Sequence, residues 1–250
     1  MMGRLDNKKA LITGSSRGIG RAIAKKFAEE GAKVGLNYHS SDEKAREVLD
    51  YVNDHSGGLL LKGDVSEKSD CERIVREFVD EYDGLDILVN NAGILKLKNL
   101  ENSTIETFDR TIDVNVRGPF MMSKYSLEHL KDSNSGRIIN MSSHWAFRGS
   151  DQATSYVVSK TALIGLTRAL ALELGPKGIT VNGIAPGTIE TDMVSDRYSK
   201  EEKKTRIKEI PVKRLGKPED IADTALFLAS DEGDYVNGEI IGVNGGVTIH

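Results

Sequence analysis

Short apolar runs alternate along the chain with longer segments in which apolar residues recur every three or four positions. The first pair is a run at 10–13 followed by a segment at 18–30, where Ile19, Ile23 and Phe27 share one helical face. Further strand-like runs lie at 33–36, 59–61, 85–89, 137–141, 179–184 and 240–243, with helical segments at 42–53, 67–82, 105–130, 154–174 and from 218. This alternation predicts an α/β fold with a doubly wound, seven-stranded parallel sheet that has helices on both faces.

The helical segment at 105–130 contains Gly118 and Pro119, which predict a bend or a boundary within it. Connections are short except for the one that follows the run at 179–184. That segment, about 189–216, lies beyond the carboxyl end of a strand, where open α/β sheets bind ligands, so we expect a substrate lid there. No repeat or linker divides the chain, and residues 1–250 should form a single domain.

Composition narrows the possible partners. The chain has 250 residues and a net charge of −4 with both signs interspersed, which does not favour nucleic acid or membranes as partners. Cys71 is the only cysteine, so no intrachain disulfide can form, and its place in a helical segment favours a structural role. No apolar run approaches the ~18 residues of a membrane span, and no signal segment opens the chain. We expect a soluble, cytoplasmic protein.

A glycine-rich turn joins the first strand to the first helix, with the sequence Thr-Gly-Ser-Ser-Arg-Gly-Ile-Gly at 13–20. Gly14 allows the sharp turn, Gly18 lets a pyrophosphate approach the backbone, and Gly20 lets the helix pack closely on the sheet. The helix N-terminus favours the phosphate charge. This turn predicts a dinucleotide-binding site.

The same turn also matches G-x-S-x-G, in which Ser16 would be the nucleophile of a serine hydrolase. That fold needs an oxyanion loop from an earlier strand, and only thirteen residues precede the motif. It also needs a downstream histidine, and none of the candidates has a suggestive context; they are His55, His129, His144 and His250. The hydrolase is therefore the weaker alternative.

The end of the second strand bears on the choice between NAD and NADP. A carboxylate there binds the adenine ribose of NAD and repels the extra phosphate of NADP. This chain has Asn37 and then no acid before Asp42. Arg17 in the glycine-rich turn is placed to reach a 2′-phosphate, and Ser40 and Ser41 are placed to donate hydrogen bonds to it. These residues favour NADP(H) over NAD(H).

Tyr156 and Lys160 are four residues apart, which puts them on one face of a helix. The ammonium group favours the ionised phenol and should lower its pKa from about 10. Such a phenol exchanges a proton near neutral pH, which carbonyl reduction and alcohol oxidation both require. The spacing alone arises often by chance, although no other of the seven tyrosines has a lysine four residues on.

Several motifs occur together and in one order. They are Thr13-Gly14-x-x-x-Gly18-x-Gly20, Asn90-Asn91-Ala92-Gly93, Asn115, Ser143, Tyr156-x-x-x-Lys160 and Pro186-Gly187. From about Lys8 to Gly246 the chain thereby resembles the short-chain dehydrogenase/reductase family. The resemblance implies a single Rossmann-type domain and hydride transfer between nicotinamide and a carbonyl or secondary alcohol, without a metal.

The resemblance implies four catalytic residues. Tyr156 would be the general acid or base at the substrate oxygen, and Lys160 would lower its pKa and bind the nicotinamide ribose. Ser143 would donate a hydrogen bond to the substrate oxygen, and it fits the family spacing better than Ser142. Asn115 would hold a water in a proton relay to Lys160, although a helix residue that bonds backbone is the plainer interpretation.

Cofactor contacts are expected from six places along the chain, and many of them would equally suit plain turn structure. The full set is Gly14, Ser16, Arg17, Gly18, Ile19 and Gly20; Asn37 and Ser40; Asp64 and Val65; Asn91, Ala92 and Gly93; Tyr156 and Lys160; and Pro186, Gly187, Ile189 and Thr191.

Within the family, segments 186–193 and 236–246 are most similar to 3-oxoacyl-[acyl-carrier-protein] reductases of fatty acid biosynthesis. This implies a substrate carried on the acidic acyl carrier protein. Of the two basic positions that dock the carrier, Lys177 matches one, Asn134 stands at the other, and Lys131 lies near. The bulky segment 144–148 instead suits a sugar, polyol or aromatic ketone, so a sugar or polyol dehydrogenase or a general ketone reductase stays open.

The resemblance also implies a homotetramer in which the helices around Asn115 and Tyr156 form one interface. Apolar positions in the second of these helices suit that interface or the core of one chain equally; examples are Leu163, Leu166 and Leu170. A non-catalytic dinucleotide-binding module is the remaining alternative, and the intact catalytic set argues against it.

Overall fold

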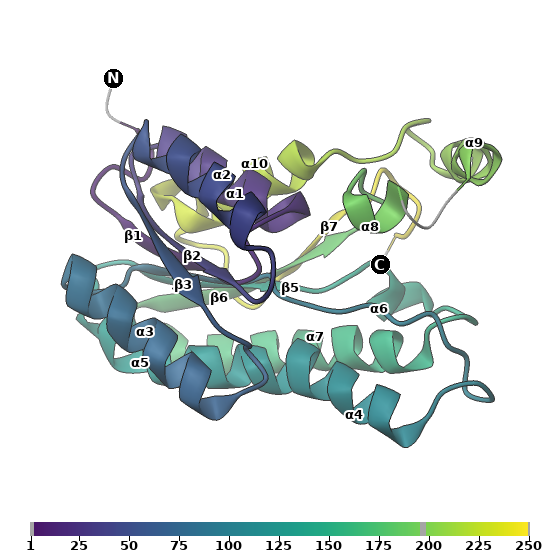
Figure 1. The fold of residues 1–250 in the computed structure, drawn as a ribbon, viewed down its shortest axis with the longest axis horizontal. Coiled ribbons are helices and arrows are strands. Elements are labelled where there is room, and N and C mark those ends of the chain that lie inside the picture. The colour runs from purple at the N-terminus through teal and green to yellow at the C-terminus, as the bar shows by residue number, and fades with distance from the viewer. Residues whose placement is uncertain (1–2, 196–198, 250) are drawn as a thin grey trace.

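One parallel sheet with the strand order β3-β2-β1-β4-β5-β6-β7 organises the molecule (Figure 1). The computed structural model describes residues 3–195 and 199–249, which include all seven strands. They are β1 (Lys9–Ile12), β2 (Lys33–Tyr38), β3 (Gly58–Lys62), β4 (Ile87–Asn90), β5 (Gly136–Met141), β6 (Ile179–Pro186) and β7 (Ile240–Val243). The strand order reverses between β1 and β4, the point at which such sheets bind ligands. The expected doubly wound, seven-stranded sheet is confirmed.

Helices cover both faces of this sheet (Figure 1). One face carries α1 (Gly18–Glu29), α2 (Asp42–Asn53) and α10 (Pro218–Ala229); the other carries α3 (Lys68–Tyr82), α4 (Ile105–Ile112), α5 (Gly118–Asp132) and α7 (Thr154–Leu174). Shorter helices follow β5 and β6, namely α6 (Trp145–Arg148), α8 (Asp192–Ser195) and α9 (Lys200–Glu209). Single 3-10 turns lie at Gly175–Lys177 and Asp231–Gly233.

Successive residues of the central strands point into two separate apolar cores. Ala10 and Ile12 belong to the core under α1 and α10, whereas Leu11 between them belongs to the core under α3 and α5. Ile87 and Leu88 of β4 divide in the same way. Because both faces are covered, these strands read as continuous apolar runs, which is the signal that the sequence carried.

A π-helical turn, η1 (Asp113–Arg117), divides the helical segment that was expected at 105–130. The predicted boundary at Gly118 falls directly after it, and Pro119 lies in the first turn of α5, where a missing N–H is tolerated. A Cβ on Gly118 would lie 2.9 Å from the Val65 carbonyl oxygen, so glycine lets α5 approach the loop after β3. Asn115 sits in the middle of this irregular turn.

Strand β6 runs two residues further than expected, because Pro186 pairs with Val243 of β7. Proline is tolerated at this strand end since it lacks only an N–H, while its carbonyl accepts a hydrogen bond from the N–H of His144 at 3.0 Å. The short helix α6, which the sequence did not predict, begins directly after His144. These contacts place the residues after β5 beside the end of β6.

Other expectations concern single features. Cys71 is buried in α3, and burial raises the pKa of its thiol to about 12, in keeping with a structural role. Within 3–195 and 199–249, no helix is both long and apolar enough to cross a membrane, and no cluster of acidic, histidine or cysteine side chains is arranged to hold a metal. The segment expected as a lid, 189–216, contains α8 and α9, and its residues 196–198 lie outside the described residues.

Candidate active site

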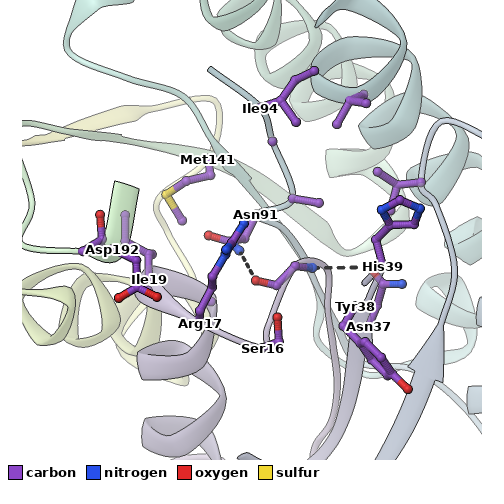
Figure 2. Close-up of a pocket in the computed structure, with 18 of the residues that line it drawn as sticks. Ser16, Arg17, Ile19, Asn37, Tyr38, His39, Asn91, Ile94, Met141 and Asp192 are labelled. Carbon is purple, nitrogen blue, oxygen red and sulfur yellow. Dashed lines mark hydrogen bonds between the residues drawn. The ribbon is translucent and has the colours of Figure 1, made fainter. Parts of the chain in front are cut away.

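A cleft runs along the carboxyl ends of strands β1 to β6 (Figure 2). Its lining includes every residue that the sequence suggested for cofactor contact, together with Ser143. These residues are spread between positions 14 and 191, and the parallel sheet brings them to one edge. Asn115 is the one expected site residue that does not line the cleft.

The glycine-rich turn leaves a bare backbone at the start of α1. Gly14 and Gly18 have φ angles of +65° and +54°, in the left-handed region that favours glycine. A Cβ on Gly14 would lie 2.9 Å from the Cα of Ala92, and a Cβ on Gly20 would overlap the Gly14 carbonyl. The first turn of α1 has no acidic residue and no side-chain cap, so its N–H groups are open to an anion. This cradle fits the pyrophosphate of a dinucleotide.

Asn91 holds the turn from the β4 side. Its side-chain nitrogen donates to the carbonyls of Thr13 at 2.9 Å and Gly14 at 3.0 Å. In return, the hydroxyl oxygen of Thr13 accepts the backbone N–H groups of Asn91 and Ala92, both at 3.0 Å. These four hydrogen bonds join the loops after β1 and β4 at the point where the strand order reverses.

Asn37 holds the same turn from the β2 side, and it lies opposite Asn91 in Figure 2. Its Oδ1 accepts the N–H of Gly14 at 3.3 Å, and its Nδ2 donates to carbonyls of the β3 segment. Although Asn37 borders the cleft, it is only 1% exposed. Its amide is therefore occupied by protein backbone.

At the other end of the cleft, α7 presents Tyr156 and Lys160 one turn apart, as the spacing predicted. The Nζ of Lys160 lies 5.6 Å from the centroid of the Tyr156 ring and donates to the Met141 carbonyl at 2.7 Å. Lys160 is 4% exposed, and burial lowers the pKa of its ammonium group to about 8. The lysine is thus held at the phenol by the last residue of β5.

The two serines after β5 differ in what their hydroxyls do. Ser142 donates its hydroxyl hydrogen to the Lys160 carbonyl at 2.8 Å. Ser143 instead accepts the backbone N–H of Trp145 at 3.2 Å, and within residues 3–195 and 199–249 its hydroxyl donates no hydrogen bond to the protein. This difference favours Ser143 over Ser142 as the group that binds a substrate oxygen.

Asn115 is fully buried behind the cleft. Its side chain accepts the N–H of Ile94 at 2.8 Å and donates to the carbonyl of Ile94 at 2.9 Å and to the Ser159 hydroxyl at 3.0 Å. A Cβ on Gly93 would lie 3.2 Å from Asn115 Oδ1 and 3.3 Å from Lys160 Nζ. Asn115 therefore bonds backbone, as its plainer interpretation held, and it also lies close to Lys160.

Comparison with known proteins gives consistent matches over nearly the whole chain. Residues 14–248 match the family model described as enoyl-(acyl carrier protein) reductase. The chain is 43% identical over 247 residues to an uncharacterized oxidoreductase of Thermotoga maritima, with 96% of this chain and 97% of that protein covered. This chain belongs to the short-chain dehydrogenase/reductase family.

Two further relatives of this short-chain dehydrogenase/reductase carry more specific descriptions. The present chain is 40% identical over 241 residues to the 3-oxoacyl-[acyl-carrier-protein] reductase FabG of Staphylococcus aureus, with 96% of this chain and 98% of that protein covered. Its structure matches a short-chain dehydrogenase from Burkholderia cenocepacia in complex with NADP, with a TM-score of 0.93, 36% identity, and 98% and 99% coverage. The protein is an oxidoreductase, which removes the serine hydrolase and the non-catalytic module as alternatives.

The surroundings of Ser16 in the glycine-rich turn also argue against a serine hydrolase. Ser16 lines the cleft, and within the described part of the chain no hydrogen bond links it to a histidine. His144 directly follows the cleft residue Ser143, but its Nδ1 lies 3.3 Å from the Thr248 hydroxyl, with which it forms a hydrogen bond. Burial lowers the pKa of the His144 side chain to about 4. His250 lies outside the described residues.

Some lining residues of this short-chain dehydrogenase/reductase escaped the sequence analysis. They are Tyr38, His39, Gly63, Ile94, Arg110, Val114, Met141, Asp192 and Val194. Ser41 and Ser142, which the sequence suggested beside Ser40 and Ser143, also line the cleft. Tyr38 and His39 directly follow Asn37, and since loops after parallel strands line the crevice, their position was a usable signal. Arg110 comes from α4, and nothing in the sequence indicated that this helix reaches the cleft.

Arg110 pairs with Asp64 on the wall of the cleft beyond β3. Its Nη2 lies 2.6 Å from Asp64 Oδ2, and His39 Nε2 lies 3.8 Å from the same oxygen. Burial opposes ionisation of Asp64, but hydrogen bonds from Ser66 and Arg110 outweigh it and hold its pKa below the ordinary value. Asp64 is thus an ionised carboxylate that protein groups already neutralise.

We expect the burial of Lys160 to make stability depend on pH. Its pKa is about 8 in the folded protein against 10.5 ordinarily, so between these values the unfolded chain binds more protons. Stability therefore rises with pH across this window, and the Lys160→Met variant should lack that rise. Urea unfolding of both proteins from pH ~8 to ~10.5 measures this effect. As the pH rises, the unfolding free energy of the wild type should increase relative to that of Lys160→Met.

The matched control is Leu163→Ala, which changes the same helix without removing a titrating group. Its free-energy difference from the wild type should be constant over this pH range. A constant difference for Lys160→Met as well would contradict the lowered pKa.

Proposed function

We propose that this protein is an NADP(H)-dependent reductase that converts a 3-oxoacyl thioester to the 3-hydroxyacyl thioester. The observation that carries the proposal is the set of Ser143, Tyr156 and Lys160 along the same cleft as the glycine-rich turn. The Staphylococcus aureus relative, described as a 3-oxoacyl-[acyl-carrier-protein] reductase, supports the substrate class.

When bound in the cleft, the nicotinamide would supply the hydride that reduces the carbonyl carbon. Tyr156 donates its phenolic proton to the carbonyl oxygen, and takes it back when the reaction runs toward alcohol oxidation. The buried ammonium of Lys160, 5.6 Å from the ring centroid, favours the phenolate left behind. Ser143 donates its hydroxyl hydrogen to the same substrate oxygen and stabilises the charge that develops there.

In this scheme Asn115 helps to reprotonate Tyr156 after it has given its proton to the substrate. Its amide is fixed by Ile94 and Ser159, and Gly93 separates it from Lys160 without a side chain between them. We assign to Asn115 the positioning of a water beside Lys160, through which the phenol is reprotonated. The π-helical turn supports this role, since such turns are frequent at functional sites.

NADP(H) is the proposed cofactor because the loop after β2, residues 39–41, has no carboxylate that would repel a 2′-phosphate and because the cleft offers groups that can bind it. Asp42, the first acid, accepts the Tyr38 hydroxyl at 3.0 Å and pairs with Lys62 at 3.0 Å. Arg17 is exposed at the cleft, and Ser40 lines it, so both can bind the 2′-phosphate. The NADP complex of the Burkholderia cenocepacia relative supports the same choice.

A docking site for the acidic carrier protein is proposed at the ends of α5 and α7. Lys131 bonds Glu128 at 2.7 Å, and the charges of Lys177 and His129 also act on that carboxylate and lower its pKa. Lys131 and Lys177 therefore lie in one region, and Lys131 replaces the basic group that is missing at Asn134. Carrier acids would meet this pair of lysines.

A ketone with an aromatic or cyclic group is the second candidate substrate. Trp145 packs edge-on against Tyr156, with ring centroids 5.9 Å apart and an interplanar angle of 88°. This places a large apolar surface next to the proposed acid, which suits a planar substrate group. A sugar, polyol or general ketone reductase on the same fold would use it.

A homotetramer is the proposed assembly. Exposed apolar side chains lie on α4, α5 and α7, namely Ile105, Phe108, Phe120, Val158 and Leu172. Leu163 is not part of this set, because it is 1% exposed and buried within its own chain. Burial of these side chains between copies would remove them from water.

Turnover by purified protein tests the reaction. With NADPH, acetoacetyl thioesters on carrier protein or coenzyme A should be reduced faster than sugars and simple diketones. Tyr156→Phe removes the proton donor and should lower kcat by about 10²–10⁴-fold. Ser143→Ala should lower it by about 10²–10³-fold. Tyr51→Phe, on the outer helix α2, is the matched control, and undiminished turnover in Tyr156→Phe would refute the acid role.

Fluorescence titration tests cofactor choice. The dissociation constant should be lower for NADPH than for NADH, because the 2′-phosphate finds Arg17 and no free carboxylate. Arg17→Ala should raise the NADPH constant by roughly tenfold through loss of a charged hydrogen bond. Arg21→Ala, one turn further along α1 and outside the cleft lining, should not. Equal or reversed affinities in the wild type would overturn the assignment.

Light scattering measures the assembly. The particle should have four times the 27.3 kDa mass of one chain. Phe120→Asp puts a charge into the proposed interface and should give smaller particles, whereas Leu100→Asp changes an exposed apolar residue outside α4, α5 and α7. A monomeric wild type would refute the tetramer.

A further inference from the structure

We propose that Asn37 is a positioning residue, which shapes the glycine-rich turn and makes no side-chain contact with the adenine ribose. The inference rests on the proposed function only in that the cleft binds a nicotinamide dinucleotide. It changes what the end of β2 contributes: the missing carboxylate at this position is not itself the source of cofactor selectivity.

Hydrogen bonding leaves Asn37 no free donor. Its Nδ2 carries two hydrogens, and they go to the carbonyls of Leu61 at 3.0 Å and Gly63 at 3.2 Å. Its Oδ1 accepts the N–H of Gly14 at 3.3 Å. A ribose hydroxyl would have to displace one of these bonds from a side chain that is 1% exposed.

The backbone of Asn37 adds to the same connection. Its carbonyl accepts both the N–H of Ser15 at 2.9 Å and the Ser15 hydroxyl at 3.1 Å. One residue therefore links the segments that follow β1 and β3, and it does so at the turn that precedes α1.

Asn37 and Asn91 hydrogen-bond to the two peptide units of Gly14 from opposite sides (Figure 2). Asn37 takes the Gly14 N–H, whereas Asn91 takes the Gly14 carbonyl at 3.0 Å. Gly14 has a left-handed φ of +65°, which the chain must hold for the turn to form. With both polar groups of Gly14 bonded, the turn is held in the shape that opens the N-terminus of α1 to phosphate.

An aspartate at position 37 distinguishes the two roles. If the side chain faced the ribose, Asn37→Asp would supply the carboxylate that favours NADH and repels NADPH. In this structure the new carboxylate oxygen would face the Leu61 and Gly63 carbonyl oxygens. Two hydrogen bonds would be lost, and the negative carboxylate would be repelled by the partly negative carbonyl oxygens. The turn would then loosen for both cofactors alike.

Fluorescence titration of wild type and Asn37→Asp with NADPH and with NADH is the test. Both dissociation constants should rise by a similar factor of roughly tenfold, so that their ratio stays within about twofold of the wild-type ratio. In steady-state kinetics the loss should appear in the KM for NADPH more than in kcat. Loss of NADPH affinity together with a gain for NADH would overturn the proposal.

The matched control is Asn182→Asp. Asn182 is also 1% exposed, donates to the Val236 carbonyl and accepts the Glu239 N–H, and it lies outside the cleft lining. The Asn182→Asp variant should leave the dissociation constants for NADPH and NADH unchanged. An equal rise in this variant would mean that any buried aspartate weakens cofactor binding, which would contradict a specific role of Asn37.

Two further arms keep the outcomes separate. If Asn37→Asp does not fold, Asn37→Ser removes the bonds to β3 without a charge and should again raise both constants together; a change for only one cofactor would overturn the proposal. A wild type that binds neither cofactor would refute the proposed function itself, whereas a changed ratio in the variant refutes only the role of Asn37.

Discussion

The structure depends on how the Gly14 peptides are held at the point where the strand order reverses. Asn91 from the β4 side and Asn37 from the β2 side bond its carbonyl and its N–H. Because buried backbone groups must be paired, these two side chains supply what neighbouring strands supply elsewhere in the sheet. The turn keeps its left-handed glycine, and α1 starts with open N–H groups at the cleft.

The other end of the cleft is held by three consecutive residues at the end of β5. The Met141 carbonyl accepts a hydrogen bond from the Lys160 ammonium, the Ser142 hydroxyl donates to the Lys160 carbonyl, and the Ser143 hydroxyl accepts the N–H of Trp145. The position of α7 against β5 thus sets the position of the proposed acid. Burying an ammonium group costs free energy, and the lowered pKa of Lys160 is the sign of that cost.

Much of the fold was predictable because its signals are local. Strands covered on both faces are largely apolar, so β1 and β4 stand out as apolar runs, and glycines 14, 18 and 20 mark a turn that side chains would block. Boundaries moved by two residues where tertiary contacts extended a strand, as when Pro186 paired with Val243. The π-helical turn at Asp113–Arg117 has no such local pattern.

The sequence by itself determined the order of elements, the glycine-rich turn and the Tyr156–Lys160 pair, because periodicity, glycine positions and spacing are properties of the chain. Ser143 and Asn115 were candidates through the resemblance to the family. Only the tertiary structure decided which atoms those residues offer. Asn37 turned out to be bonded to Gly14 and β3, and Arg110 came from a distant helix to pair with Asp64. Hydrogen bonds between segments far apart in the chain depend on packing, and no spacing along one segment encodes them.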